Sequence, residues 1–182
     1  EYYIHPLVSK KAITTLFSRF EHDEGSIHTL EIYSKNSQIV RLAVEPYKLT
    51  DKREIFSLSK SFTSTAIGLL YDEDKLTVED RIIDIFPDKV PEVISDNLAE
   101  MKIKNVLSMN TGHESCVMPR MYNSDDPVKA FMSVEVIYKP GTHFASNTGA
   151  TMLLACIVEK LTGMSLLDYL TKKIFIDMEI YD

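Results

Sequence analysis

The pattern of apolar and polar positions predicts a helix first, then a β-hairpin, and then a chain that is almost entirely helical. In residues 8–20 apolar side chains recur every three or four positions, as on one face of an amphipathic helix. Residues 26–46 alternate between apolar and polar side chains around a polar turn at 35–37, which is typical of a hairpin. From residue 57 onward the apolar spacing has a helical period. This order of elements predicts an α+β fold.

Start and stop signals divide the helical part into several helices. These are predicted over residues 57–71, from the capping-box-like Thr77–Asp80 to Pro87, over 103–109, over 147–161, and after Ser165. Gly163 is expected to close the fourth of these helices, because glycine adopts the left-handed conformation of a helix end at little cost. Residues 113–127 show no period and contain several helix breakers, so we predict a long loop there.

Length and charge narrow the class of protein. A chain of 182 residues is long enough for one domain with a real core, and a composition of 45% hydrophobic and 26% charged residues is ordinary for a globular protein. The net charge of −7 argues against a nucleic-acid partner, because no basic surface stands out to meet phosphates. No apolar run approaches the length of a membrane span.

The cysteines and the N-terminus say little about compartment. Cys116 and Cys156 are too few for a disulfide framework, and neither stands in a metal-binding spacing. No signal peptide is recognised, but the chain opens on Glu1 rather than methionine, so an N-terminal segment removed from the chain is one expectation. The sequence leaves both cytoplasmic and exported locations open.

The stretch FSLSKSFT, residues 56–63, sets one lysine among four hydroxyl side chains just before an apolar helical segment. Residues three apart on a helix lie on one face, about 5–6 Å apart at Cβ, so Lys60 is within reach of the Ser57 hydroxyl. A neutral amine there would take the proton of a serine that is otherwise a weak nucleophile. The backbone N–H of Ser57 itself, at the start of the helix, would be one oxyanion donor.

A second interpretation of the same residues needs no chemistry. In it, Ser57 caps the helix and Lys60 is a solvated lysine of the first turn. The surroundings favour the catalytic interpretation, since this is the one Ser-x-x-Lys sequence in the chain and it stands where extended chain meets an apolar helix.

Several phrases of the sequence resemble the serine β-lactamase and penicillin-binding protein superfamily, in the class C-like branch that also holds esterases and D-aminopeptidases. They occur in the family's order at FSLSKSFT (56–63), LTVEDRIIDIFP (76–87), MKIKNVLSMNTGH (101–113) and KPGTHFASNTGATMLLACIVEKLTG (139–163). The resemblance implies a β-lactamase/transpeptidase-like α+β fold, in which a mostly helical region accompanies part of an antiparallel sheet. It also implies that Ser57 is acylated and that Lys60 transfers its proton.

By the same resemblance the substrate would be a β-lactam, a small ester or a peptide ending in a D-amino acid, and no metal or organic cofactor is implied. The expected partner is therefore a small-molecule or peptide substrate. A non-catalytic relative that uses the pocket to bind a peptidoglycan-like ligand or a protein is the alternative, and an inactive fragment is a third possibility.

One departure from the family concerns its tyrosine motif, Tyr-x-Asn. The corresponding place reads FASNT and contains no tyrosine. Either Ser146 takes the tyrosine's place with Thr148 third, or one residue is deleted and Asn147 matches the motif's asparagine. In the first case Ser146 relays a proton, and Asn147 and Thr148 contact the substrate. A simple helix cap at Ser146 or Asn147 explains the same residues without chemistry.

The other departure is the family's third motif, Lys-Thr-Gly or His-x-Gly, which is missing. Family members are roughly twice as long, so residues 1–182 are expected to form one partial domain, with a hairpin at 26–46 and a mainly helical region at 57–182. An open sheet would then be covered by a homo-oligomer or by a separate C-terminal segment.

The histidines suggest a competing site. His113 and His143 invite a Ser-His-Asp triad with Asp125 or Asp126, but no Gly-x-Ser-x-Gly sequence supports it. We expect both histidines to pack or cap instead.

Overall fold

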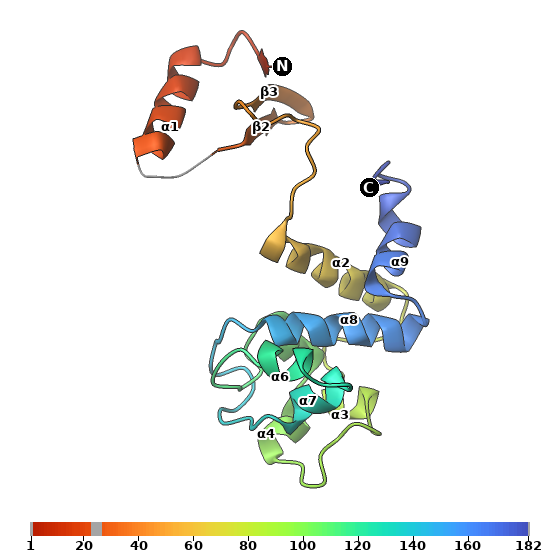
Figure 1. Ribbon diagram of the computed structural model, residues 1–182. Helices are drawn as coiled ribbons and strands as arrows, with labels where there is room; N and C mark the ends of the chain where they lie inside the picture. The colour runs from red at the N-terminus through yellow and green to blue at the C-terminus, as the bar shows by residue number, and fades with distance from the viewer. Residues whose placement is uncertain (1, 23–26, 182) are drawn as a thin grey trace. The chain divides into compact units, whose positions relative to one another are not determined.

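The computed structural model describes residues 2–22 and 27–181. Within it the chain divides into two compact units, residues 1–54 and 55–182, which are described separately below (Figure 1). The combination of helices with a small antiparallel sheet confirms the predicted α+β class. The prediction of one partial domain over residues 1–182 stays a prediction.

The first unit is a three-stranded antiparallel sheet with one helix. Its elements are β1 (Tyr2–Ile4), α1 (Lys10–His22), β2 (Thr29–Ser34) and β3 (Ser37–Ala43). The strand order is β1-β3-β2, so the predicted hairpin forms and β3 also pairs with β1. The predicted hairpin began at residue 26, which lies outside the described residues.

Alternation along β3 gives this unit its core. Val40 and Leu42 are buried together with Ile13 of α1, because every second residue of a strand points to the same face. On the neighbouring strand Ile32 and Leu30 pair with these two residues. Of the apolar residues predicted to form one face of this helix, Ile13 and Phe17 belong to the buried cluster, whereas Phe20 is exposed.

The second unit is built from helices. They are η1 (Phe56–Leu58, a 3₁₀ turn), α2 (Ser59–Asp72), α3 (Ile82–Ile85), α4 (Asp96–Glu100), α5 (Ile103–Leu107), α6 (Met118–Tyr122), α7 (Pro127–Ser133), α8 (Thr148–Thr162), α9 (Leu166–Leu170) and η2 (Thr171–Phe175, a π-helical turn). Helix α8 contacts α2, α5, α6, α7 and α9.

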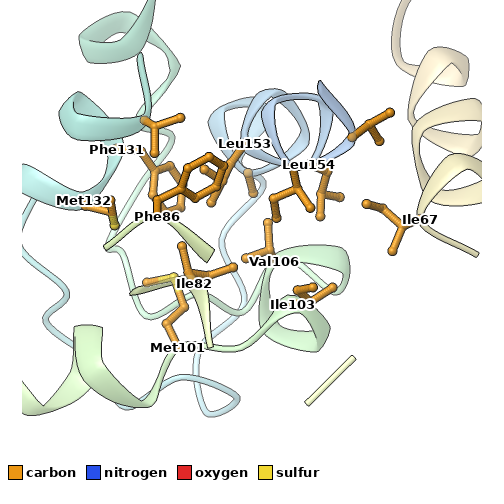
Figure 2. Packing of buried hydrophobic residues seen from close by; sticks show 14 of the residues in the cluster. Ile67, Ile82, Phe86, Met101, Ile103, Val106, Phe131, Met132, Leu153 and Leu154 are labelled. Atoms are coloured by element: carbon orange, nitrogen blue, oxygen red, sulfur yellow. The ribbon is translucent and has the colours of Figure 1, made fainter. Parts of the chain in front are cut away.

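Buried side chains around α8 form the core of this unit. Leu153 and Leu154 of α8 lie between Phe131 of α7, Val106 of α5 and Ile67 of α2 (Figure 2). Each such side chain stabilises the fold by roughly 1.5–3 kcal/mol relative to its exposed state. As predicted, α8 ends at Gly163, which has a φ of 70°.

The prediction of a long loop over residues 113–127 is wrong in part. Helix α6 lies inside this stretch and α7 begins at its last residue. The two prolines that suggested breakers, Pro119 and Pro127, stand in the first turns of these helices, where a proline has no hydrogen bond to lose. Five-residue helices are also too short to show a period.

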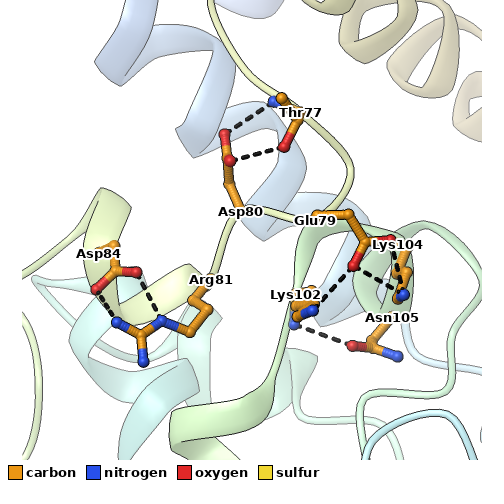
Figure 3. Close-up of polar contacts among 8 residues, drawn as sticks. All are labelled: Thr77, Glu79, Asp80, Arg81, Asp84, Lys102, Lys104 and Asn105. Carbon is orange, nitrogen blue, oxygen red and sulfur yellow. Dashed lines mark hydrogen bonds and ion pairs between the residues drawn. The ribbon is translucent and has the colours of Figure 1, made fainter.

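The capping box expected at Thr77–Asp80 forms only in part and starts no helix, since the Asp80 N–H donates to the Thr77 carbonyl rather than to its hydroxyl. The Thr77 hydroxyl donates to Asp80 Oδ1 at 2.7 Å, and its backbone N–H donates to Oδ2 at 2.8 Å (Figure 3). Helix α3 begins only at Ile82, after an extended Arg81 that forms a β-bridge with Lys102. At this bridge the Ile82 N–H donates to the Met101 carbonyl and the Asp80 carbonyl accepts from the Ile103 N–H, so these groups are not available for helical hydrogen bonds.

Ion pairs reinforce this corner of the structure. Glu79 lies between Lys102 and Lys104, at 2.9 and 2.7 Å, and hydrogen bonds from these two ammonium groups lower the pKa of Glu79 to about 2 (Figure 3). Arg81 pairs with Asp84 at 2.7 Å. These side chains are solvated, so the ion pairs contribute little to the free energy of folding.

Candidate active site

Ser57 lies in a strained turn that ends the extended chain and starts α2. The preceding residue, Phe56, has a φ of 42°, in the left-handed region that side chains with a Cβ occupy at a cost of about 1–2 kcal/mol. One 3₁₀ turn follows, and α2 continues from Ser59. The predicted helix over 57–71 therefore begins as a 3₁₀ turn, and the turn leaves Ser57 exposed to solvent.

Two of the other three hydroxyls of FSLSKSFT bond back to the helix itself. Ser59 Oγ donates to the Phe56 carbonyl at 2.7 Å, and Thr63 Oγ1 donates to the Ser59 carbonyl at 3.3 Å. Such bonds satisfy a short hydroxyl within its own turn of helix. Ser57 differs, because its hydroxyl is bonded by a side chain.

That side chain is the lysine predicted from the sequence. Lys60 Nζ donates to Ser57 Oγ at 3.0 Å, and Lys60 is half-buried. Among the residues that the structure describes, no carboxylate forms an ion pair with Lys60. The amine is therefore directed at the serine rather than held by an acid.

An oxyanion donor is available at the same place. The Ser57 N–H stands at the open start of η1, where the described part of the chain provides no acceptor for it. A free N–H on the residue that carries the reacting oxygen is suitable for a developing negative charge.

The residues proposed for the tyrosine motif lie at the start of α8. Asn147 is the N-cap, and its Oδ1 accepts from the backbone N–H groups of Val117 at 3.1 Å and Ala150 at 3.3 Å. It is 1% exposed, and within the described residues its Nδ2 has no hydrogen-bond partner. The structure therefore agrees with the interpretation of Asn147 as a helix cap. A contact between Asn147 and a substrate stays a prediction.

Ser146 and Thr148 are both exposed. No hydrogen bond joins Ser146 to Ser57 or Lys60 within residues 27–181. Thr148 lines the same apolar groove as Leu58 and Ser59. In the chain, Ser57 directly precedes these two residues and Lys60 directly follows them. Thr148 therefore lines a groove together with neighbours of Ser57 in the chain, while its contact with substrate and the proton-relay role of Ser146 stay predictions.

Cys116 is a residue that sequence reasoning did not place at this site. Burial acts to raise the pKa of its thiol, but hydrogen bonds from the backbone N–H groups of Met118, Gly149 and Thr148 outweigh it, and the pKa is lowered. Two of these donors are in the first turn of α8, more than thirty positions away in sequence. No local pattern could have signalled the contact.

The two histidines do not form a triad with Ser57. His113 is 1% exposed, its Nδ1 lies 2.9 Å from Thr111 Oγ1, and its ring packs edge-on against Phe131 at 4.8 Å. Burial lowers the pKa of His113 to about 4. His143 stacks on Tyr138 at 4.1 Å, and Asp126 caps α7 while it pairs with Lys89 at 2.7 Å.

No metal or membrane site emerges from the described residues. They contain no group of three histidine, cysteine or acidic side chains able to hold a metal ion. Within residues 2–22 and 27–181, no single helix is long and apolar enough to span a membrane. The helices Thr148–Thr162 and Leu166–Phe175 reach that length and apolarity only when they are taken together, and they are bent at the break between them.

Comparison with known proteins finds one matching family model and one set of curated relatives. A family model described as Beta-lactamase matches residues 30–182. The curated Protein flp of Staphylococcus aureus (strain MW2) is 29% identical over 128 residues, which are 67% of this chain and 26% of that protein. This chain therefore spans about a quarter of the curated relatives it matches.

Solved structures show the same fold. EstA from Arthrobacter nitroguajacolicus superposes with a TM-score of 0.72 at 18% identity, over 96% of this chain and 47% of its own. A class C β-lactamase mutant gives a TM-score of 0.75 at 16% identity, over 97% and 52%. The octameric penicillin-binding protein homologue from Pyrococcus abyssi gives 0.69 at 19% identity, over 93% and 42%.

Proposed function

The chain belongs to the β-lactamase family, whose fold is a serine-hydrolase fold, and we propose that it acts by acyl transfer through an acyl-enzyme on Ser57. The observation that carries the proposal is the 3.0 Å contact between Lys60 Nζ and Ser57 Oγ. A base within hydrogen-bond distance of a nucleophile is the geometry that proton abstraction needs.

The proposed chemistry uses few groups. Neutral Lys60 accepts the proton of Ser57 as Oγ attacks the carbonyl carbon of the substrate, and the Ser57 N–H donates to the oxyanion that forms. When the tetrahedral intermediate collapses, the leaving group departs with the proton from Lys60 and the acyl group stays on Ser57. Water then attacks this ester and gives a proton to Lys60, which passes it to Ser57 Oγ as the acid departs, so that both Ser57 and Lys60 return to their starting state.

The substrate class is proposed as a β-lactam, a small ester or a peptide ending in a D-amino acid. The structural neighbours include EstA, a class C β-lactamase mutant and a penicillin-binding protein homologue, and each of these names describes that protein only. Asn147 and Thr148 are proposed to contact the substrate from the start of α8, and Ser146 is proposed to relay a proton.

Covalent labelling tests the proposal. The chain is incubated with a fluorophosphonate and, separately, with a fluorescent penicillin, and the adduct is located by intact mass and peptide mapping. We expect a mass increase on Ser57 with at least one reagent, and none in Ser57→Ala. Ser64→Ala, an exposed serine of the same helix, is the matched control and should label normally. Absence of any adduct on protein shown to be folded contradicts the proposal.

A second candidate is a non-catalytic relative that binds its ligand reversibly. It is favoured by the FASNT sequence, which has no tyrosine, and by the absence of a hydrogen bond from Ser146 to Ser57 or Lys60 in the described residues. Under this candidate the fluorescent penicillin shows saturable binding by anisotropy with no mass increase. The same sample therefore separates the two functions.

A further inference from the structure

Phe56, the residue before the proposed nucleophile, has a backbone conformation that its own side chain does not hold in place. Its φ of 42° lies in the left-handed region, which side chains with a Cβ rarely adopt. The phenyl ring is 77% exposed and the Leu58 side chain is exposed as well, so packing of these side chains does not fix the backbone. An uncommon conformation persists only where other contacts impose it. Here those contacts are hydrogen bonds.

The Phe56 carbonyl accepts two hydrogen bonds from one residue, Ser59. The Ser59 hydroxyl donates to it at 2.7 Å, and the Ser59 backbone N–H donates to the same oxygen. Two donors on one acceptor restrict the rotation of that carbonyl more than the backbone bond alone. The Ser59 hydroxyl therefore acts on the turn itself, whereas the hydroxyl of Ser57 is contacted by Lys60.

The carbonyl that Ser59 binds and the proposed oxyanion donor belong to the same peptide group. This group joins Phe56 to Ser57, so it carries the Phe56 C=O and the Ser57 N–H. A trans peptide group is planar, and its C=O and N–H point in opposite directions. Contacts that fix the carbonyl therefore also fix the direction of the N–H. Hydrogen bonds to the carbonyl polarise the group as well, which makes its N–H a stronger donor.

We propose that Ser59 is a positioning residue for the reaction at Ser57. Its hydroxyl holds the peptide group between Phe56 and Ser57 so that the Ser57 N–H is directed at the oxyanion, while Lys60 remains the group that moves the proton. The inference rests on the proposed function, since it assigns this N–H to the oxyanion of acyl transfer. A purely structural hydroxyl would satisfy only its own hydrogen bond, and its loss would leave the reaction rate unchanged.

Three substitutions separate the hydroxyl of Ser59 from the shape of its side chain. Ser59→Ala removes the hydroxyl, and Ser59→Thr keeps it, since a threonine hydroxyl in a helix also bonds to a carbonyl of the preceding turn. Ser59→Val has the shape of threonine without the hydroxyl. Ser64→Ala, which changes an exposed serine of the same helix, is the control.

Each chain is labelled with a fluorophosphonate at several pH values, well below its melting temperature, and the adduct on Ser57 is quantified by mass. The phosphoryl oxygen of this probe gains negative charge as Ser57 attacks, so the labelling rate reports on the oxyanion donor. We expect Ser59→Ala and Ser59→Val to label about 10–100-fold more slowly than the parent at every pH. Ser59→Thr and Ser64→Ala should label at close to the parent rate. The pH of half-maximal labelling should be the same throughout, because Lys60 is unchanged.

A second measurement follows the peptide group itself and needs no activity. In nuclear magnetic resonance spectra of the labelled chain, the carbonyl ¹³C resonance of Phe56 and the amide ¹⁵N resonance of Ser57 both respond to hydrogen bonds on the peptide group that joins these residues. We expect both resonances to move in Ser59→Ala and in Ser59→Val. In Ser59→Thr they should stay close to their positions in the parent, because the hydroxyl contact is kept.

Several results would overturn the inference. Parent-like labelling of Ser59→Ala, or equal labelling rates for Ser59→Thr and Ser59→Val, would show that the hydroxyl does not assist the reaction. A displaced pH of half-maximal labelling in Ser59→Ala would mean that Ser59 acts through Lys60 instead. Unchanged resonances of Phe56 and Ser57 would exclude the contact on the carbonyl. If the parent itself does not label on Ser57, the proposed function fails and the inference fails with it, whereas a parent that labels no faster than Ser59→Ala overturns the inference alone.

Discussion

Lys60 is the residue on which the proposed chemistry depends most directly, because it is the side chain that contacts Ser57 Oγ. We predict that Lys60→Met lowers the rate of fluorophosphonate labelling by about 10²–10⁴-fold, the usual contribution of a positioned base. The Lys60 amine is half-buried and forms no ion pair within the described residues, so it contributes little to folding and the free energy of unfolding should change by about 0.5 kcal/mol or less. Lys172→Met, an exposed lysine of η2, serves as control. An unchanged labelling rate in Lys60→Met would exclude a role for Lys60 as base.

His113 makes stability depend on pH. Burial lowers its folded-state pKa from 6.5 to about 4, so the unfolded chain binds a proton at a higher pH than the folded chain does. The stabilisation from neutral His113 is present above pH 6.5 and is lost as the pH falls toward 4. This loss amounts to about 3 kcal/mol at most.

The measurement is urea unfolding at several pH values across this interval. His113→Gln should flatten the pH dependence, because glutamine has no proton to bind there. Equal slopes for the parent and His113→Gln would show that His113 does not titrate in this way.

Asn147 allows a structural role to be separated from a substrate contact. Asn147→Asp keeps a side-chain oxygen that accepts from Val117 and Ala150, whereas Asn147→Ala leaves the buried N–H of Val117 without its partner and leaves that of Ala150 only the Asn147 carbonyl. We expect Asn147→Ala to lose about 1–3 kcal/mol in chemical denaturation and Asn147→Asp to lose less. If the two variants are equally unstable, the amide nitrogen has a role that the described contacts do not explain.

At the scale of elements, Gly149 allows the start of α8 to pack closely against α6, because it has no side chain. A Cβ on Gly149 would lie 2.6 Å from Val117 Cγ2 and 2.9 Å from Met121 Sδ, whereas one on Gly68 in α2 would meet nothing within 4 Å. We predict that Gly149→Ala destabilises the protein by about 1–3 kcal/mol through overpacking. Gly68→Ala should stabilise it by about 0.5–1 kcal/mol, since alanine is the better helix former.

Thermal unfolding of the two variants beside the parent checks this pair. Because both changes add one methyl group to a helical glycine, the opposite signs isolate the effect of packing. A stabilising Gly149→Ala would mean that Val117 and Met121 can move aside freely.

How far the sequence predicts an element depends on its length. The long apolar period of α8 and its Gly163 end specify that helix almost to the residue, and Ser165 caps α9 as predicted. The three-residue β1 and the five-residue α6 are too short to show a period, so they were missed. Ser57 and Lys60 were predictable because they are one turn apart on one helix. The donors around Cys116 were not, since they come from a separate helix.

At the scale of the whole molecule, the division into units of residues 1–54 and 55–182 has a consequence for proteolysis. Lys48, Lys52 and Arg53 are exposed and lie outside the helices and strands, where backbone is most readily cleaved. We predict that limiting trypsin cuts first at these residues and gives two fragments by mass spectrometry. The triple variant with glutamine at the three positions should persist longer. A first cut within α2 or α8 would contradict the division.

The left-handed conformation of Phe56 means that selection for thermal stability and selection for catalytic turnover favour different residues at this position. A screen that rewards only heat resistance would replace Phe56 with glycine or asparagine, which accept a φ of 42° at lower cost, and would lose nothing from the core because the phenylalanine ring is exposed. A screen that rewards turnover would keep any residue that holds the following serine in place. Libraries randomised at this single codon and sorted by each criterion would show how much local strain the nucleophile requires.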